Sequence, residues 1–196
     1  RLRCADRLYI KGLGMHTAST AAYKLDGRYR FSRKVSLTLG YDLEDMQRDN
    51  AEVEQTEEQG VWGKFKWKIH NRLDSWLKLA RYSRDGSGYN PILDDDGYYV
   101  ENPLLRKYHL ADREQNTAGI RMAYVPVNWL SFTGKAEVRD DDYDDTEIGL
   151  TDAKRNIYFL EAAYVPGGRF SGHASVTHEM IESKQRGDSS AAGDIW

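Results

Sequence analysis

Within the segment between Val61 and Ala80, charged and large apolar residues alternate strictly from Lys64 to Ile69. Three lysines stand at every second position and three large apolar residues fill the neighbouring ones: Lys64, Phe65, Lys66, Trp67, Lys68 and Ile69. A period of two is typical of a β-strand, whose successive side chains point to opposite faces. The segment therefore predicts a strand with one apolar and one cationic face, as in a soluble antiparallel sheet or in a membrane barrel.

The same pattern recurs along the chain in four hairpin-like units. Each unit has an alternating arm, a short turn and a second alternating arm that ends in charged residues. The predicted turns lie near these pairs: Arg33-Lys34, Asn71-Arg72, Val127-Asn128 and Gly167-Gly168. We expect eight long strands from these units and a ninth around residues 8–15.

The remaining connections are long, polar and acidic. They cover residues 47–55, 84–112 and 140–152, together with the stretch after residue 185. Short turns at one end and long loops at the other are typical of outer-membrane barrels. The predicted strands, of about ten to fourteen residues, are longer than those of most soluble sheets, and about ten tilted residues cross a bilayer. The pattern favours a membrane barrel over a soluble sandwich or solenoid.

Composition supports a membrane role for strands rather than helices. Among the 196 residues there is no apolar run near the length of about eighteen that a spanning helix needs. The 13 Tyr and five Trp tend to stand near the ends of the alternating segments, which favours an interface with a membrane. The opening residues lack the zones of a secretory signal. We therefore expect a single barrel segment, residues 1–196, from a longer chain.

Charge and cysteine content exclude several classes of site. A net charge of −3 gives no general reason to expect nucleic acid as a partner. The single cysteine, Cys4, excludes an internal disulfide and a Cys-x-x-Cys-His haem attachment site within these residues.

No motif in the chain indicates catalysis, so we expect no enzyme and no catalytic residues. Ser171 and His173 share a polar face, but no nucleophile motif accompanies them. The acidic run that contains Asp140, Asp142 and Asp144 could supply oxygen ligands to calcium, although it lacks the spacing and the glycine of an EF-hand. A solvated loop is the preferred interpretation of this run, and a calcium site is the weaker alternative.

Three stretches of the chain resemble a known family. They are YSRDGSGYNP (82–91), NPLLRKY (102–108) and DDDYDDTEIGLTDAK (140–154). Together with the repeated hairpins, they resemble the MtrB/PioB family of decahaem-associated outer-membrane β-barrel proteins. The resemblance implies an all-β fold, an antiparallel up-and-down transmembrane β-barrel of roughly two dozen strands, of which this chain would supply an arc of about 8–9. The family's amino-terminal Cys-x-x-Cys feature has no counterpart here, because Cys4 stands alone.

The resemblance also implies a structural role in the bacterial outer membrane. The barrel would sheathe a periplasmic decahaem c-type cytochrome in a porin-cytochrome conduit for extracellular electron transfer, with an outer-surface multihaem cytochrome as a further partner. It would need no cofactor of its own, because the partner carries the haem c. The alternative is a diffusive porin whose cationic lumen attracts small anions.

A barrel assigns the two faces of each strand to lipid and to lumen. The lipid-facing side is predicted to carry Leu37, Leu39, Phe65, Trp67, Ile69, Leu130 and Phe132. The lumen-facing side, in contact with the cytochrome, is predicted to carry Arg28, Arg30, Lys64, Lys66, Lys68, Arg121, Lys135 and Arg139. A Lys or Arg facing lipid at mid-depth would cost roughly 2 to 4 kcal/mol, which enforces this register. A cationic wall could pair with haem propionates and acidic protein surface, and so orient the cytochrome.

Overall fold

Strands make up most of the protein. The computed structural model describes residues 3–11, 14–49, 51–93, 96–99, 101–143, 146–189 and 194–195. The strands are β1 (Arg3–Lys11), β2 (Gly14–Arg30), β3 (Val35–Arg48), β4 (Gln55–His70), β5 (Leu73–Gly86), β6 (Leu105–Arg106), β7 (Arg113–Val127), β8 (Leu130–Asp142), β9 (Ile148–Tyr164), β10 (Gly172–Arg186), β11 (Asp188–Ser189) and β12 (Asp194–Ile195). No helix long and apolar enough to cross a membrane occurs within the described part of the chain.

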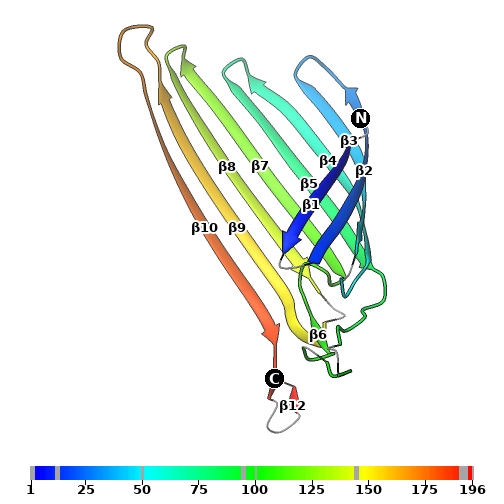
Figure 1. Cartoon of the computed structure of the whole chain (residues 1–196). Helices are drawn as coiled ribbons and strands as arrows, with labels where there is room; N and C mark the ends of the chain where they lie inside the picture. The colour runs from blue at the N-terminus through cyan, green and yellow to red at the C-terminus, as the bar shows by residue number, and fades with distance from the viewer. Residues whose placement is uncertain are drawn as a thin grey trace.

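The nine long strands form one antiparallel sheet in chain order. Each of β1 to β5 pairs with the next, β5 pairs with β7, and the order continues to β10, while the short β6 pairs with β9. The sheet curves but does not close, so β1 and β10 are its two edges (Figure 1). The prediction of an up-and-down arc of about 8–9 long strands is confirmed.

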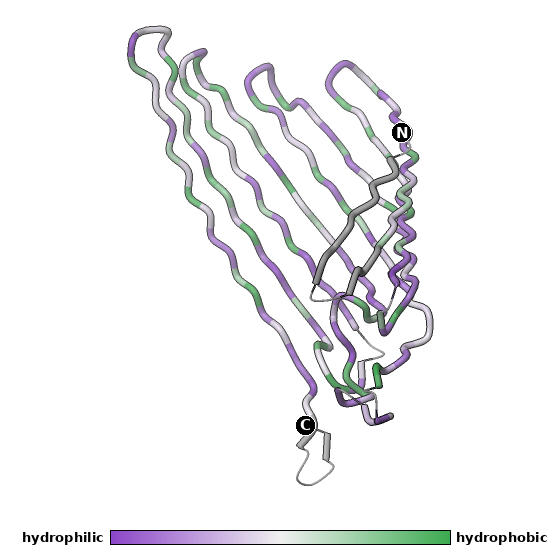
Figure 2. The backbone as a smooth tube through the Cα atoms, viewed as in Figure 1, coloured by the Kyte–Doolittle hydropathy of each residue, from purple (hydrophilic) through white to green (hydrophobic). Residues whose placement is uncertain are grey.

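The outer face of the sheet is a continuous apolar surface without a second layer on it. Leu37 pairs with Phe65, Phe65 with Leu77, and Leu77 with Ile120, so apolar residues run from strand to strand. Leu39 on this face is 58% exposed. Figure 2 shows how hydrophobic and hydrophilic residues alternate along the strands. Exposed apolar surface of this extent is what the predicted lipid-facing side of a barrel requires.

Short turns join the strands at one end of the sheet, which we call the turn end. They span residues 31–34, 71–72, 128–129 and 165–171, close to the four predicted pairs, although the fourth is longer than predicted because β10 begins only at Gly172. In the first turn, the backbone N–H groups of Lys34 and Val35 both donate to Ser32 Oγ at 3.1 Å. In the next, Arg72 Nη1 donates to the Pro126 carbonyl oxygen at 2.5 Å and ties two neighbouring turns together.

Several strand boundaries differ from the prediction at the opposite end, the loop end. The chain reverses between Lys11 and Gly14, which pair with each other, so the expected single strand over residues 8–15 is wrong. The strands also extend further than expected into the acidic connections, since β3 reaches Arg48 and β8 reaches Asp142. Their charged residues suggested loops, but acidic and basic side chains on neighbouring strands neutralise each other and permit continued pairing.

Outward-facing ion pairs cover the strands at the loop end, beyond the apolar surface. Arg81 Nη2 lies 2.6 Å from Glu114 Oε2, Lys154 Nζ lies 3.5 Å from Asp140 Oδ2, and Lys184 Nζ lies 3.7 Å from Asp152 Oδ1. We call this belt the polar collar (Arg81, Glu114, Asp140, Asp152, Lys154 and Lys184). It explains why the outward face of β5 changes from Leu77 and Leu79 to Arg81: the strand has left the apolar zone.

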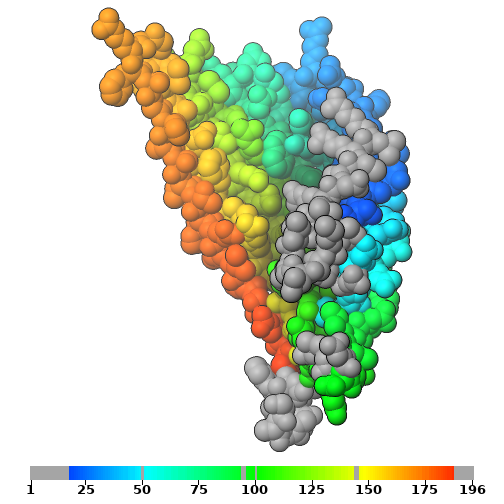
Figure 3. Space-filling model, in the orientation of Figure 1, coloured from blue at the N-terminus to red at the C-terminus, as the bar shows by residue number. Residues whose placement is uncertain are grey.

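The loop between β5 and β7 folds over the inner face of the sheet at the loop end (Figure 1). Arg84, which points to the inner face, donates from Nη2 to the carbonyl oxygens of Tyr108 and Ala111, both at 2.6 Å. Further along the loop, Leu105 in β6 pairs with Ile148 in β9. In Figure 3 the green atoms of this loop lie beside the yellow start of β9. The loop therefore links the end of β5 to the start of β9, two strands that β7 and β8 separate in the sheet.

A second set of contacts fixes the loop to the connection between β3 and β4. Lys107 Nζ lies 2.7 Å from Glu52 Oε1 and 2.9 Å from Glu101 Oε2. Burial lowers the pKa of Lys107, but its hydrogen bonds to these two carboxylates outweigh burial and raise it. Burial and the nearby Glu52 charge raise the pKa of Tyr89 to about 12, so this phenol stays neutral, with the Arg106 guanidinium 4.3 Å from its ring centre.

Gly149→Ala should release β6 from β9. Gly149 has φ +125°, and a Cβ atom there would lie 2.5 Å from the Arg106 carbonyl oxygen. We expect a loss of about 1 to 3 kcal/mol in local stability from backbone strain and the lost bridge. Limited proteolysis of the folded full-length protein should then cut residues 96–112 faster. Gly88→Ala is the matched control, because nothing lies within 4 Å of its added Cβ; equal cleavage in the two variants would contradict the prediction.

Candidate functional site

The inner face of the sheet gathers the predicted lumen-facing cations. One row of paired positions crosses the sheet near the turn end: Arg30, Ser36, Lys66, Trp76, Arg121 and Lys135. The next row towards the loop end contains Arg28, Thr38, Lys64 and Lys78. Lys68 and Arg139 lie on the same face by the same alternation. Contact of this face with a cytochrome stays a prediction.

The predicted lipid-facing residues all lie on the opposite, outer face. Leu37 pairs with Phe65 and Val35 with Trp67, and the row that contains Phe132 pairs it with Tyr124 and Ala162. Phe65 is 38% exposed and Phe132 44%. The structure therefore separates the two predicted sets completely, while direct contact of the apolar set with lipid stays a prediction for each residue.

A hollow of about 390 Å³ lies at the turn end of the inner face. We call it the cationic hollow, after the seven basic residues that line it: Arg28, Arg30, Arg33, Lys34, Lys66, Lys68 and Arg121. Asp74 is the only carboxylate among its described lining residues. Arg28 Nη2 donates to Ser36 Oγ at 3.1 Å. In the described part of the chain, however, none of the seven cations forms an ion pair.

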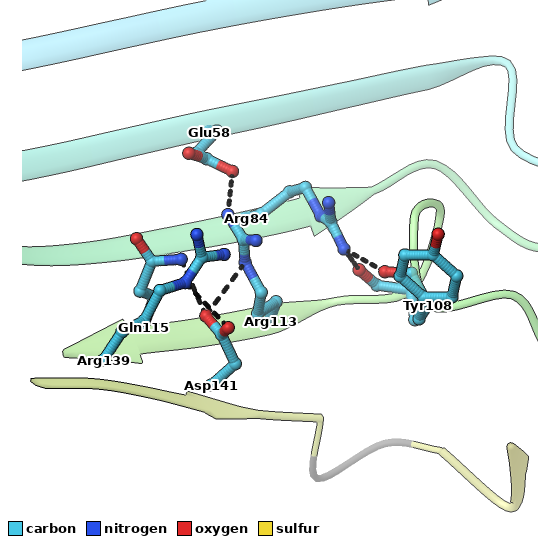
Figure 4. Close-up of polar contacts among 8 residues, drawn as sticks. Glu58, Arg84, Tyr108, Arg113, Gln115, Arg139 and Asp141 are labelled. Atoms are coloured by element: carbon cyan, nitrogen blue, oxygen red, sulfur yellow. Dashed lines mark hydrogen bonds and ion pairs between the residues drawn. The ribbon is translucent and has the colours of Figure 1, made fainter. Parts of the chain in front are cut away.

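The inner face at the loop end is different, because its charges compensate one another (Figure 4). Arg113 Nη2 lies 2.6 Å from Glu58 Oε2. Asp141, which is 7% exposed, accepts hydrogen bonds from Gln115 Nε2 at 2.7 Å and from Arg139 Nε at 2.8 Å. Arg113 Nε is 3.9 Å from the same carboxylate. Each arginine of this network thus has an acidic neighbour.

Two more cations on the inner face are paired with carboxylates. Lys135 Nζ lies 2.7 Å from Glu137 Oε2, and Arg155 Nε lies 2.5 Å from Glu179 Oε1. Of the eight predicted cations, Lys135 and Arg139 are therefore already neutralised within the chain. The remaining six have no ion pair in the described part of the chain, and contact of all eight with a cytochrome stays a prediction.

Aromatic rings lie flat on the inner face above glycines. A Cβ atom on Gly60 would lie 2.0 Å from the Tyr82 ring, and one on Gly40 would lie 2.3 Å from the Trp62 ring. Glycine is needed at both positions so that the rings can approach the backbone. Lys64 Nζ lies 4.3 Å from the centre of the Trp76 ring, a cation–π contact.

Sequence reasoning missed the network around Asp141 and the role of Trp62 and Tyr82. Alternation alone assigns these residues to the inner face. Except for Arg139 and Asp141, which both lie on β8, the contacts join different strands, so they depend on the register between strands, which the sequence pattern does not specify. Arg113 and Glu58, for example, stand 55 positions apart.

The acidic run shows no assembled calcium site in its described part. Asp140 points outward and pairs with Lys154, whereas Asp141 points inward. Asp142 stands opposite Asp152, and Asp144 lies outside the described residues. No group of three or more metal-ligating side chains occurs among the residues that the structure describes. The calcium alternative stays an untested prediction.

The chain resembles known outer-membrane proteins. A family model described as outer membrane beta-barrel porin, MtrB/PioB, matches residues 16–196. A protein named Outer membrane protein MtrB, from Shewanella baltica (strain OS185), is 32% identical over 174 residues, which are 89% of this chain and 25% of that protein. The chain thus spans about a quarter of the length of this relative.

Proposed function

Because the chain belongs to the MtrB/PioB family of outer-membrane β-barrel porins, we propose that it forms an arc of a barrel that sheathes a periplasmic multihaem c-type cytochrome. The barrel would hold the cytochrome across the outer membrane, so that electrons pass through the partner's haems to an outer-surface multihaem cytochrome or another external acceptor. This chain needs no cofactor for that role. It supplies the wall that separates the haems from lipid.

The charge distribution on the inner face is the observation that supports a protein partner most directly. Six of the predicted lumen-facing cations form no ion pair in the described part of the chain, while arginines at the loop end are neutralised by Glu58 and Asp141. Uncompensated charge along an enclosed wall raises the local concentration of oppositely charged groups. Haem propionates and acidic side chains of a cytochrome have the matching charge.

The two ends of the sheet suit different compartments. Short turns face the periplasm and longer loops face outward in barrels of this kind. The turn end, with the cationic hollow, is then the end at which a periplasmic cytochrome enters. The loop end, where the loop of β6 folds inward, is the end at which electrons leave for the outer surface.

Haem content tests this proposal against the diffusive porin that the same cationic wall would also suit. The full-length protein should be purified from outer membranes in mild detergent, and its absorbance compared with its protein concentration. We expect c-type haem in fixed stoichiometry with the barrel. A barrel without haem that conducts small anions across planar bilayers would overturn the proposal and support the diffusive porin.

A further inference from the structure

We propose that the cationic hollow binds a carboxylate-rich surface of the inserted cytochrome and thereby sets how deeply the cytochrome sits; this inference rests on the proposed function. The hollow lies between the ends of β2, β4 and β7 and the first turn. Its occupant is defined by chemistry: several carboxylates held on one rigid protein surface.

The hollow has one carboxylate against seven basic residues among its described lining residues. Asp74 is the only carboxylate among the described residues that line it, and it forms no ion pair within 4.0 Å in the described part of the chain. The contrast with Arg113 and Arg139 shows that this wall can supply acidic partners, and does so at the loop end. Like charges gathered in one concave surface repel each other, and an anionic surface placed against them removes that repulsion.

The width of the hollow favours a protein surface over a small anion. Its outermost strand cations come from β2 on one side and β7 on the other, and β3, β4 and β5 lie between them, with Lys66 and Lys68 on β4. Five adjacent strands at about 4.8 Å spacing span roughly 19 Å. A single phosphate or chloride would neutralise one or two cations of such a row. A surface with several carboxylates at fixed distances can meet Arg30, Lys66 and Arg121 together.

Arginine content suits this occupant as well. Arg28, Arg30, Arg33 and Arg121 offer planar guanidinium groups that bind carboxylates with two parallel hydrogen bonds. Such geometry fixes orientation as well as charge. Because the hollow lies at the turn end, an acidic surface bound there would stop further movement of the cytochrome towards the loop end.

Two triple variants of the full-length protein test the proposal. Arg30→Gln, Lys66→Gln and Arg121→Gln together remove the charge. Arg30→Lys, Lys66→Arg and Arg121→Lys together keep it and serve as the matched control. After washing at 0.15 M salt, we expect the charge-removing variant to retain no more than about one tenth of the c-type haem per barrel that the wild type retains. The control should retain the wild-type amount. Heat-modifiable migration on gels confirms that each variant is a folded barrel.

The possible results separate this inference from the proposed function. If wild type and charge-removing variant hold equal haem, the cytochrome is enclosed but the hollow does not bind it, which overturns the inference alone. If the wild-type barrel holds no haem, no cytochrome occupies it, and both this inference and the proposed function are overturned. If the charge-preserving control loses as much haem as the charge-removing variant, the inference is also overturned, because side-chain shape and not charge would then decide binding.

A cross-linking experiment identifies the surface that meets the hollow. A photoreactive amino acid is placed at Ser32, an uncharged residue of the hollow, and in a separate variant at Thr117, on the inner face further towards the loop end. We expect Ser32 to capture a cytochrome peptide rich in Asp and Glu, and Thr117 to capture a different segment. Capture by Thr117 alone, or of a peptide without acidic residues by Ser32, would overturn the proposal.

Discussion

Leu39→Arg is expected to lower the free energy of unfolding of the full-length barrel in lipid by about 2 to 4 kcal/mol, the cost of a cation that faces hydrocarbon near mid-depth. Leu39 is the central outward residue of the apolar run on β3 and is 58% exposed in the open arc. Its neighbours across the strands are Gly27 and Gly63, so a longer side chain meets no crowding. Denaturant titration in lipid vesicles, followed by tryptophan fluorescence, measures the change.

Gln47→Arg is the matched control for this substitution. Gln47 lies on the same strand and the same face, but at the loop end, where Gln55 stands opposite it. We expect a change of about 1 kcal/mol or less there, because the cost of a charge falls towards the membrane surface. Equal effects at the two positions would contradict the assignment of the apolar surface to lipid.

Asp141→Ala is expected to destabilise the barrel by about 2 to 3 kcal/mol. The substitution leaves Arg139 and Gln115 without their acceptor and brings the Arg113 and Arg139 charges together without Asp141 between them. Breaking a dry buried pair costs about 3 to 5 kcal/mol. The smaller value applies here because the side chain of Arg139 is 34% exposed and water screens its charge.

A second substitution shows whether the loss comes from the unpaired cation. Arg139→Met combined with Asp141→Ala should recover part of the stability, since no arginine then faces the missing carboxylate at that position. Denaturant titrations of the two single variants and the double variant give the coupling energy. Strictly additive losses would mean that Asp141 and Arg139 do not stabilise each other.

The alternating segments were predictable because two physical constraints agree. Side chains on a strand point to opposite faces, and lipid strongly disfavours charge, so Phe65 and Lys66 could be assigned to outer and inner faces before any coordinates. The four short turns follow from the same pattern. Family likeness then limited the sheet to an arc of a larger barrel, because nine strands are far fewer than the family is expected to use.

Strand ends and loop contacts were less predictable. Asp140 and Asp142 suggested a loop by composition, whereas pairing with β7 and β9 extends β8 through both residues. The bridge between Leu105 and Ile148 joins residues that are distant in sequence, and only two residues on each strand take part. A contact of this kind leaves no periodic signal, because it depends on how a long irregular segment closes back on the sheet.

The strands continue at the loop end beyond the apolar surface, which makes the wall taller than the hydrocarbon layer that it crosses. On β4, residues Gln55 to Gln59 continue the sheet beyond Val61, the last outward apolar residue of that strand. At about 3.3 Å per residue and a tilt of about 40°, five residues add roughly 13 Å of height. In the proposed orientation, with the loop end outward, a molecule that approaches from outside the cell meets a protein rim above the lipid headgroups and can reach the mouth of the barrel without first binding the membrane.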